Sequence, residues 1–206
     1  MNELKPMGLL ASGRMIDSTL LRVPQLGPVF GPVTAGSKRL ASRYANSLRL
    51  GRPAAGIEAL APCPLIWIQA PASELPDLLL ALLRAPFSWE GKTAVLLDRD
   101  LDCSALAPLA AAGAAVASLT HVPLRQELTL LAEGDTPALR ALRSIWKVTG
   151  IRVLELKPGL KQVYTAGIMA AESLTASVVD SALACLRSAG LDPATAKRLA
   201  AALVEA

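Results

Sequence analysis

The chain has 206 residues, and Leu and Ala together supply about a third of them. Hydrophobic residues reach 52% and charged residues only 18%, which excludes intrinsic disorder, and Gly and Pro follow no period, which excludes a fibrous repeat. The formal net charge is +4, and neither an uninterrupted apolar run nor a basic leader indicates a membrane span or a secretory signal. We therefore expect a cytoplasmic globular protein of one to two domains, with no membrane partner.

Short apolar runs indicate β-strands along most of the chain. Several of these runs are apolar throughout rather than alternating, which is typical of strands that are covered on both faces. In chain order, the predicted strands are Met7–Ala11, Val29–Thr34, Pro64–Gln69, Thr93–Asp98, Ala114–Leu119, Glu127–Ala132 and Ile151–Leu156.

Helical patterns separate these strands. Ser37 and Ser73 are good N-terminal caps, and Gly113 and Gly150 are C-terminal stop signals. Strands that alternate with helices predict an α/β fold, a Rossmann-like and mostly parallel sheet with helices on both faces. The predicted helices are Ser37–Leu50, Leu75–Ala85, Cys103–Ala112 and Thr136–Thr149.

The pattern changes after the last strand, where only helices are indicated. Leu160–Ala189 is predicted as one long helix, and a final helix follows from Pro193. We therefore place a Rossmann-like domain at 1–156 and a short all-α segment at 157–206. The apolar residues of the long helix spread over more than one face, which predicts a homodimer built on it. Packing on the chain's own sheet is the alternative.

The basic residues are unevenly distributed, with eight Lys or Arg against two Asp or Glu in residues 1–52. A solvated basic helix face explains this excess, and an anion site for phosphate groups is the functional alternative. The seven aromatic residues do not alternate with the basic ones as a stacking platform requires. We therefore expect no nucleic-acid partner.

Several kinds of catalytic site have no counterpart in the sequence. One His and three widely spaced Cys predict no metal site, and they fit a reducing cytoplasm with free thiols. Neither a Gly-x-Ser-x-Gly elbow nor a P-loop is present. The single His, His121, follows a buried strand, and we expect it to be structural rather than a general acid or base. The sequence thus assigns no catalytic residue.

The turn after the first strand is a candidate dinucleotide site. A Rossmann fingerprint places three glycines there, for the tight turn, for the approach of the pyrophosphate and for the contact between helix and strand. These positions fall on Ala11, Gly13 and Ile16, so only the phosphate-approach glycine is present. Ser12 and Arg14 flank this glycine, and Arg14 can reach a phosphate oxygen. The turn therefore predicts weak binding of a dinucleotide. A turn that binds nothing is the alternative.

The residues after the second strand indicate which dinucleotide is preferred. An acidic residue at this place holds the ribose hydroxyls of NAD, whereas small, hydroxyl and basic residues suit the 2′-phosphate of NADP. This chain has Ser37, Lys38 and Arg39 there, which favours NADP. The alternative is a helix cap followed by solvated charges.

The order of these motifs resembles a known family. The chain is similar to an uncharacterised Rossmann-like family within the 6-phosphogluconate dehydrogenase-like superfamily, whose relatives include pyrroline-5-carboxylate reductase and deazaflavin-dependent NADP reductases. The residues that carry the resemblance are the Gly13-Arg14 turn, Ser37-Lys38-Arg39, the strand Leu65–Gln69 with Ala70-Pro71 after it, Glu133-Gly134-Asp135 and Tyr164-Thr165-Ala166-Gly167.

The resemblance implies an NADP-type Rossmann domain and a helical segment that often forms dimers, and it adds Ala70 and Pro71 to the cofactor site.

Two functions follow from these observations. The first is an NAD(P)-binding, oxidoreductase-like protein of unknown substrate, in which the cofactor carries the hydride. The second is a non-catalytic, homo-oligomeric module that binds a small anionic ligand or a protein partner.

Overall fold

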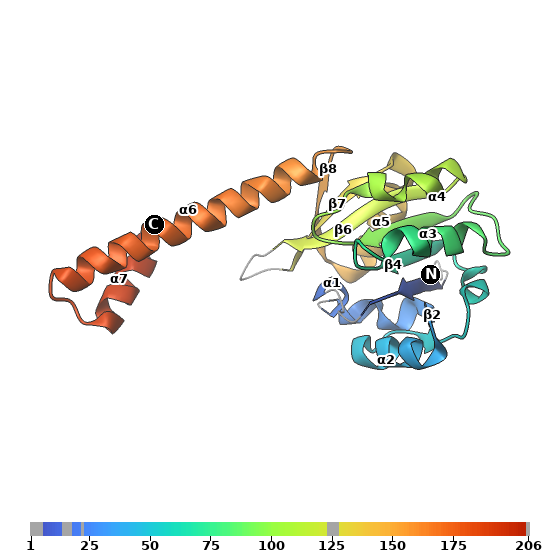
Figure 1. The fold of residues 1–206 in the computed structure, drawn as a ribbon, viewed down its shortest axis with the longest axis horizontal. Coiled ribbons are helices and arrows are strands. Elements are labelled where there is room, and N and C mark those ends of the chain that lie inside the picture. Colours follow the sequence, from blue (N-terminus) through green and yellow to red (C-terminus); the bar gives the residue numbers. More distant parts are fainter. Residues whose placement is uncertain (1–5, 14–17, 22, 123–127, 205–206) are drawn as a thin grey trace. The chain divides into compact units, whose positions relative to one another are not determined.

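A sheet of eight strands organises the first of two units into which the chain divides, Met1–Gln162 and Val163–Ala206 (Figure 1). The computed structural model describes residues 6–13, 18–21, 23–122 and 128–204. The strand order is β3-β2-β1-β4-β5-β6-β7-β8, and all neighbouring strands are parallel except β6 and β7. The predicted α/β fold with a mostly parallel sheet is confirmed.

The strands follow the apolar runs of the sequence closely. Every residue of β1, β4, β5 and β7 is buried, because helices cover both faces of the sheet at these strands. The strands are β1 (Met7–Ala11), β2 (Phe30–Ala35), β3 (Arg52–Pro53), β4 (Leu65–Gln69), β5 (Thr93–Leu97), β6 (Ala115–Val122), β7 (Thr129–Gly134) and β8 (Arg152–Leu156).

Two apolar clusters lie on the two faces of the sheet, and different helices close them. The first cluster takes side chains from α1 (Ser18–Leu21), α2 (Lys38–Leu48) and α5 (Thr136–Thr149). The second takes side chains from α3 (Leu75–Leu83) and α4 (Ala107–Ala111). The sheet is thus the middle of three layers.

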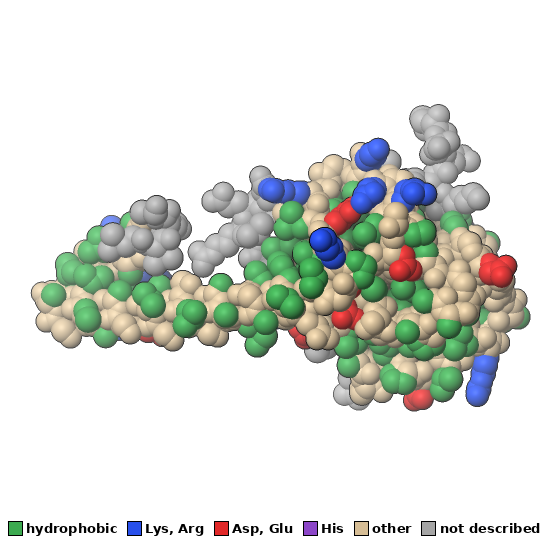
Figure 2. All heavy atoms as spheres, turned by 90° about the horizontal axis from the view of Figure 1, so that it is seen from above, with side chains coloured by type: hydrophobic (Ala, Val, Ile, Leu, Met, Phe, Trp, Pro, Cys, Tyr) green, Lys and Arg blue, Asp and Glu red, His purple; other side chains and the backbone are tan. Residues whose placement is uncertain are grey.

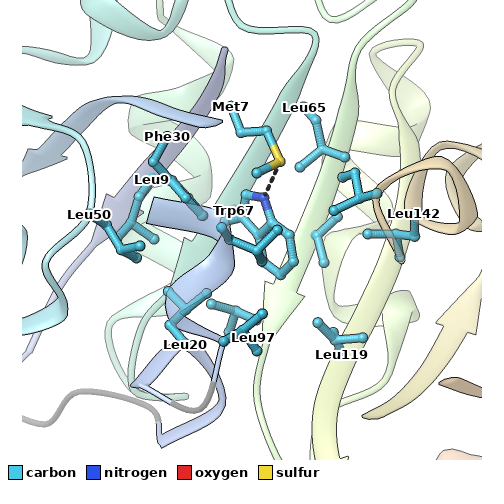
Figure 3. Close-up of a cluster of buried hydrophobic side chains, with 14 of the residues drawn as sticks. Met7, Leu9, Leu20, Phe30, Leu50, Leu65, Trp67, Leu97, Leu119 and Leu142 are labelled. Atoms are coloured by element: carbon cyan, nitrogen blue, oxygen red, sulfur yellow. Dashed lines mark hydrogen bonds between the residues drawn. The ribbon is translucent and has the colours of Figure 1, made fainter. Parts of the chain in front are cut away.

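Trp67 on β4 is the largest fully buried side chain of the first cluster (Figure 3). Its Nε1 donates to Met7 Sδ at 3.4 Å, and its ring contacts Phe30 and Trp146. These contacts join β1, β2, β4 and α5 around one side chain. They therefore fix the strands whose ends form the candidate site.

The structure contains short elements that were not expected, among them the helix α1 and the 3-10 turns Pro24–Val29 and Ile57–Leu60. The strand β3 was not expected either, since it has only two residues and both side chains are exposed.

The prediction that Ser73 caps the next helix is wrong, because Glu74 is the N-cap residue of α3 and no side chain caps it. The predicted helix Cys103–Ala112 begins as a 3-10 turn, Cys103–Leu106, before α4. Pro108 lies in the first turn of α4, where its missing N–H is tolerated.

The second unit consists of most of α6 (Lys161–Ser188) and of α7 (Pro193–Val204). With 28 residues, α6 is about 42 Å long. Hydrophobic side chains lie open along its surface (Figure 2), among them Val163, Met169, Leu174 and Val178. Its length and composition would allow it to cross a membrane, but one such helix is weak evidence for a membrane protein.

Candidate functional site

Three loops meet at one edge of the sheet, where β2, β1 and β4 end side by side. Ala11 of β1 is paired with Ala35 of β2 and with Gln69 of β4, so the residues that follow these three strands leave the sheet together. The strand order also reverses here, because the chain leads from β1 outward to β2 and β3 and then returns to β4 on the other side. Open α/β sheets bind ligands in the crevice at such a point.

Gly13 occupies a conformation that other residues avoid. Its φ is +80°, and a Cβ at this position would lie 2.6 Å from Pro71 Cγ. The preceding residue is tied to β4, because Ser12 N donates to Gln69 O at 2.8 Å. The structure thus brings together the predicted turn and the predicted x-Pro loop, and it explains why only glycine fits between them.

The side chain of Tyr44 on α2 is hydrogen-bonded to this turn. Its hydroxyl donates to Gly13 O at 2.5 Å and also lies 3.0 Å from Ser12 O. Burial raises the pKa of Tyr44, with the negative charge of Glu74 as the second cause and Arg43 acting in the opposite direction. The hydroxyl therefore remains a donor at neutral pH. The sequence analysis did not single out Tyr44, since its position within a predicted helix gives no sign of this contact.

Glu74 is an acidic side chain at the same turn, and sequence reasoning missed it. It stands just before α3, and its Oε1 lies 3.7 Å from the point where a Cβ of Gly13 would be. Its charge contributes to the raised pKa of Tyr44, which also places it beside the turn. A carboxylate here opposes the binding of a phosphate group by like-charge repulsion.

The hydroxyl of Ser12 is a buried polar group whose hydrogen bonding is incomplete within the described part of the chain. Its Oγ is shielded from solvent, and among the residues that the structure describes it makes no hydrogen bond. Buried hydroxyls without a hydrogen bond are rare, because each of them loses its contact with water. A ligand or a water molecule at the turn would restore the missing bond, and this makes Ser12 a candidate contact.

The end of β2 is open to solvent. The side-chain oxygen of Ser37 accepts a hydrogen bond from Leu40 N at 3.2 Å and so caps α2. Lys38 and Arg39 are exposed on the first turn of that helix, and nothing lies within 4 Å of a Cβ built on Gly36. The two cations are therefore accessible to a ligand that lies across the ends of β1 and β2.

The other residues predicted for the site offer only main-chain groups or lie outside the described residues. Ala11 and Ala70 are buried, so they offer main-chain groups rather than side chains. Arg14 lies outside the residues that the structure describes, as does Ile16 of the glycine fingerprint. His121 on β6 has its Nδ1 3.4 Å from Thr19 Oγ1 of α1, a contact that suits the expected structural role. That role stays a prediction.

Comparison with known proteins gives matches of structure but not of sequence. No protein-family model and no curated protein matches the chain. Solved structures of similar fold include an imine reductase from Aspergillus terreus in complex with NADPH4, with a TM-score of 0.73 and 16% identity over 98% of this chain and 72% of that one. Another is a Myxococcus stipitatus imine reductase variant in complex with NAD+, with a TM-score of 0.71 and 17% identity over 95% and 70%.

A Streptomyces aurantiacus imine reductase is also similar, with a TM-score of 0.70 and 18% identity over 98% of this chain and 73% of that one. At identities this low, the structural similarity establishes the fold alone. It confirms the Rossmann-like part of the family resemblance. The closer relation to pyrroline-5-carboxylate reductase stays a prediction. The chain spans nearly three quarters of these neighbours, so most of their fold is represented.

Proposed function

We propose that the protein is an NADP(H)-binding, oxidoreductase-like Rossmann protein, with the dinucleotide at the ends of β1, β2 and β4. The observation that carries the proposal is the meeting of three loops at the point where the strand order reverses. At this edge of the sheet Gly13 gives the chain its left-handed turn, and the buried hydroxyl of Ser12 has no hydrogen-bond partner among the described residues. Neighbours of the same fold that were solved with NADPH4 or NAD+ support the same cofactor class.

The residues at the ends of β1, β2 and β4 have separate roles in this proposal. Ser12 and Gly13, with the main chain at Ala11 and Ala70, would face the pyrophosphate, and Pro71 would line the crevice beside them. A bound nicotinamide supplies the hydride chemistry, while the protein holds and orients the cofactor. Ser37 offers its hydroxyl and main chain next to the adenosine ribose, where the 2′-phosphate distinguishes NADP from NAD.

Lys38 and Arg39 are proposed to bind the 2′-phosphate. Hydrogen bonds that involve charged groups contribute about 1.5–3 kcal/mol each, so one such bond changes affinity about ten- to a hundredfold. Calorimetric titration should therefore show NADPH binding tighter than NADH by about this factor. The double variant Lys38→Ala/Arg39→Ala should lose this preference and bind both cofactors equally.

The chain offers a matched control for this experiment. Lys197 and Arg198 form an exposed pair of the same composition on α7, in the second unit of the chain. Their replacement by Ala should leave the affinity for NADPH unchanged. Equal binding of NADPH and NADH by the wild-type protein would refute the assignment of Lys38 and Arg39.

The second candidate function is the non-catalytic module for a small anionic ligand. The position of Glu74 favours it, because this carboxylate stands beside the phosphate-approach glycine. In that case inorganic phosphate or another small anion would occupy the open end of β2 near Lys38 and Arg39. Absence of NADPH binding at millimolar concentration, together with stabilisation by a small anion, would favour this function.

We also propose that α6 forms the interface of a homodimer. Val163, Met169, Leu174 and Val178 expose more than half of their surface on this helix. Exposed apolar side chains in such a number are typical of interaction surfaces. Light scattering at high micromolar concentration tests the proposal, and a mass near the 21.5 kDa of one chain would refute it.

A further inference from the structure

A buried polar network lies next to the candidate site, on the β5–β7 side of the sheet. Its acceptor is the carboxylate of Glu133 on β7, which is 1% exposed. Gly159 N donates to Oε1 at 2.6 Å, Cys103 N donates to Oε2 at 2.9 Å, and Ser118 Oγ donates to Oε2 at 3.0 Å. The Cys103 thiol lies 3.4 Å from Oε1 as a fourth donor. The charge of Glu133 is therefore well solvated by the protein itself.

Lys161 is the cation of this network, and it is also 1% exposed. Its Nζ donates to Asp98 O at 2.6 Å, to Leu101 O at 2.7 Å and to Ser118 Oγ at 3.2 Å. An ammonium group has three protons, and each of them has an acceptor here. Burial lowers the pKa of Lys161, while the nearby carboxylates, Asp98 first, act in the opposite direction.

Ser118 joins the two buried charges. Its hydroxyl accepts from Lys161 and donates to Glu133, so the cation and the anion share one bridging group. The network ties together β6, β7, the loop after β5 and the start of α6. Lys161 belongs to the first unit of the chain, so all of these contacts lie within that unit.

The loop after β5 is the part of this network that leaves the sheet at the same edge as the loops after β1 and β4, because these three strands are parallel neighbours. Lys161 holds the main-chain oxygens of Asp98 and Leu101, and the Asp98 carboxylate accepts from Asp100 N and Leu101 N at 2.7 Å each. A dinucleotide spans the crevice with its adenosine ribose near the end of β2. Its nicotinamide half then lies on the other side of the reversal, toward β4 and β5.

We infer that Lys161 is a positioning residue, which holds the loop Asp98–Leu101 in the shape that receives the nicotinamide half of the dinucleotide. Ser118 and Glu133 in turn hold Lys161. This inference rests on the proposed NADP(H) function. It assigns to the protein a second determinant of cofactor binding, separate from the cations at the end of β2.

The test separates the two halves of the cofactor. Adenosine 2′,5′-bisphosphate contains the adenosine half alone, whereas NADPH contains both halves. In Lys161→Met, calorimetric titration should show NADPH bound at least tenfold more weakly, with the affinity for adenosine 2′,5′-bisphosphate unchanged within twofold. Lys157→Met removes an exposed Lys four residues earlier, and it should leave both affinities unchanged.

Ser118→Ala is the second variant, because it removes the bridge but leaves both charged side chains in place. It should weaken NADPH alone, in the same direction as Lys161→Met. Equal weakening of both ligands would overturn the inference, since that result would indicate a general effect on the fold. Unchanged NADPH binding in a folded Lys161→Met variant would also overturn it. If the wild-type protein binds neither ligand, the proposed function fails and this inference fails with it.

Discussion

Polar side chains have opposite environments in two regions of the sheet. The first region is formed by the ends of β1, β2 and β4, and the second by the strands β5, β6 and β7. In the first region, the open half, Lys38 and Arg39 are exposed, and Ser12 Oγ has no partner within the described chain. In the second region, the clamped half, Lys161 and Glu133 are buried, and each of them is fully hydrogen-bonded. The two regions are neighbours in one sheet.

This difference has consequences for stability and for binding. A buried charge that loses its partner is costly, because water cannot replace the lost bonds. An exposed cation keeps its hydration, so its removal changes little in the folded protein. Substitutions in the clamped half should therefore act on the free energy of unfolding, in addition to the effect on the nicotinamide half of NADPH that we infer for Lys161. Substitutions at the cations of the open half should act on the affinity for an anionic ligand alone.

Removal of the Glu133 carboxylate should have the largest effect. Glu133→Leu removes the buried anion that Ser118 bridges to Lys161 and leaves several donors without an acceptor, and a buried charge left without its compensation costs about 3–5 kcal/mol. Urea unfolding followed by circular dichroism measures the loss. Glu155→Leu on β8 is the matched control, since Glu155 pairs with Arg143 at the surface and should contribute about 1 kcal/mol or less. Equal losses in the two variants would remove the distinction between the halves.

Cys103 gives the clamped half a dependence on alkaline pH. Burial, with the charge of Glu133 as the second cause, raises the pKa of its thiol from 9.0 to about 12. Between these values the unfolded chain has lost the proton and the folded protein has kept it. The free energy of unfolding should therefore fall as the pH rises from 9.0 towards 12, by about 1.4 kcal/mol per pH unit at most.

Urea unfolding at several pH values above 9.0 tests this dependence. The wild-type protein should lose about 2 kcal/mol more than Cys103→Ala over the first one and a half pH units, because Ala has no proton to lose. Cys185→Ala, which removes the exposed thiol of α6, should follow the wild-type curve. Parallel curves for the wild-type protein and Cys103→Ala would show that this thiol titrates alike in both states.

In the open half, a substitution at Gly13 should lower the free energy of unfolding. Ala at a φ of +80°, with its Cβ 2.6 Å from Pro71 Cγ, should destabilise the protein by about 1–2 kcal/mol. Gly36→Ala at the end of β2 is the matched control, because nothing lies within 4 Å of the added carbon and its φ is not positive. Its effect should stay within about 0.5 kcal/mol. A similar loss at both glycines would contradict the packing of Gly13 against Pro71.

The smallest expected effect concerns Glu74. Glu74→Gln removes a negative charge beside the phosphate turn and should tighten NADPH binding by about two- to fivefold, the effect of about 0.5–1 kcal/mol for an exposed charge. Asp77→Asn makes the same change of charge in the first turn of α3 and should leave the affinity unchanged. Calorimetric titration measures both variants. Weaker binding by Glu74→Gln would mean that this side chain helps to hold the cofactor.

The sequence was sufficient for the fold and for part of the candidate site. Buried parallel strands leave continuous apolar runs, and the ends of β1 and β2 could be located from Gly13 and from Ser37. The clamped half could not be predicted, because Lys161 and Ser118 are 43 positions apart and no local pattern connects them. Glu74 was missed for the same reason, since its position beside Gly13 depends on how two loops fold together.

The three tryptophans of the chain, Trp67, Trp89 and Trp146, are all buried in the first unit. Residues 163–206 contain none, and Tyr164 is their only aromatic residue. Indole fluorescence therefore reports on the state of the sheet alone, whereas the helical signal in circular dichroism includes α6 and α7. Loss of both signals at one temperature would mean that the two units melt as a single cooperative body. A helical signal that changes before the fluorescence would mean that the C-terminal helices unfold on their own.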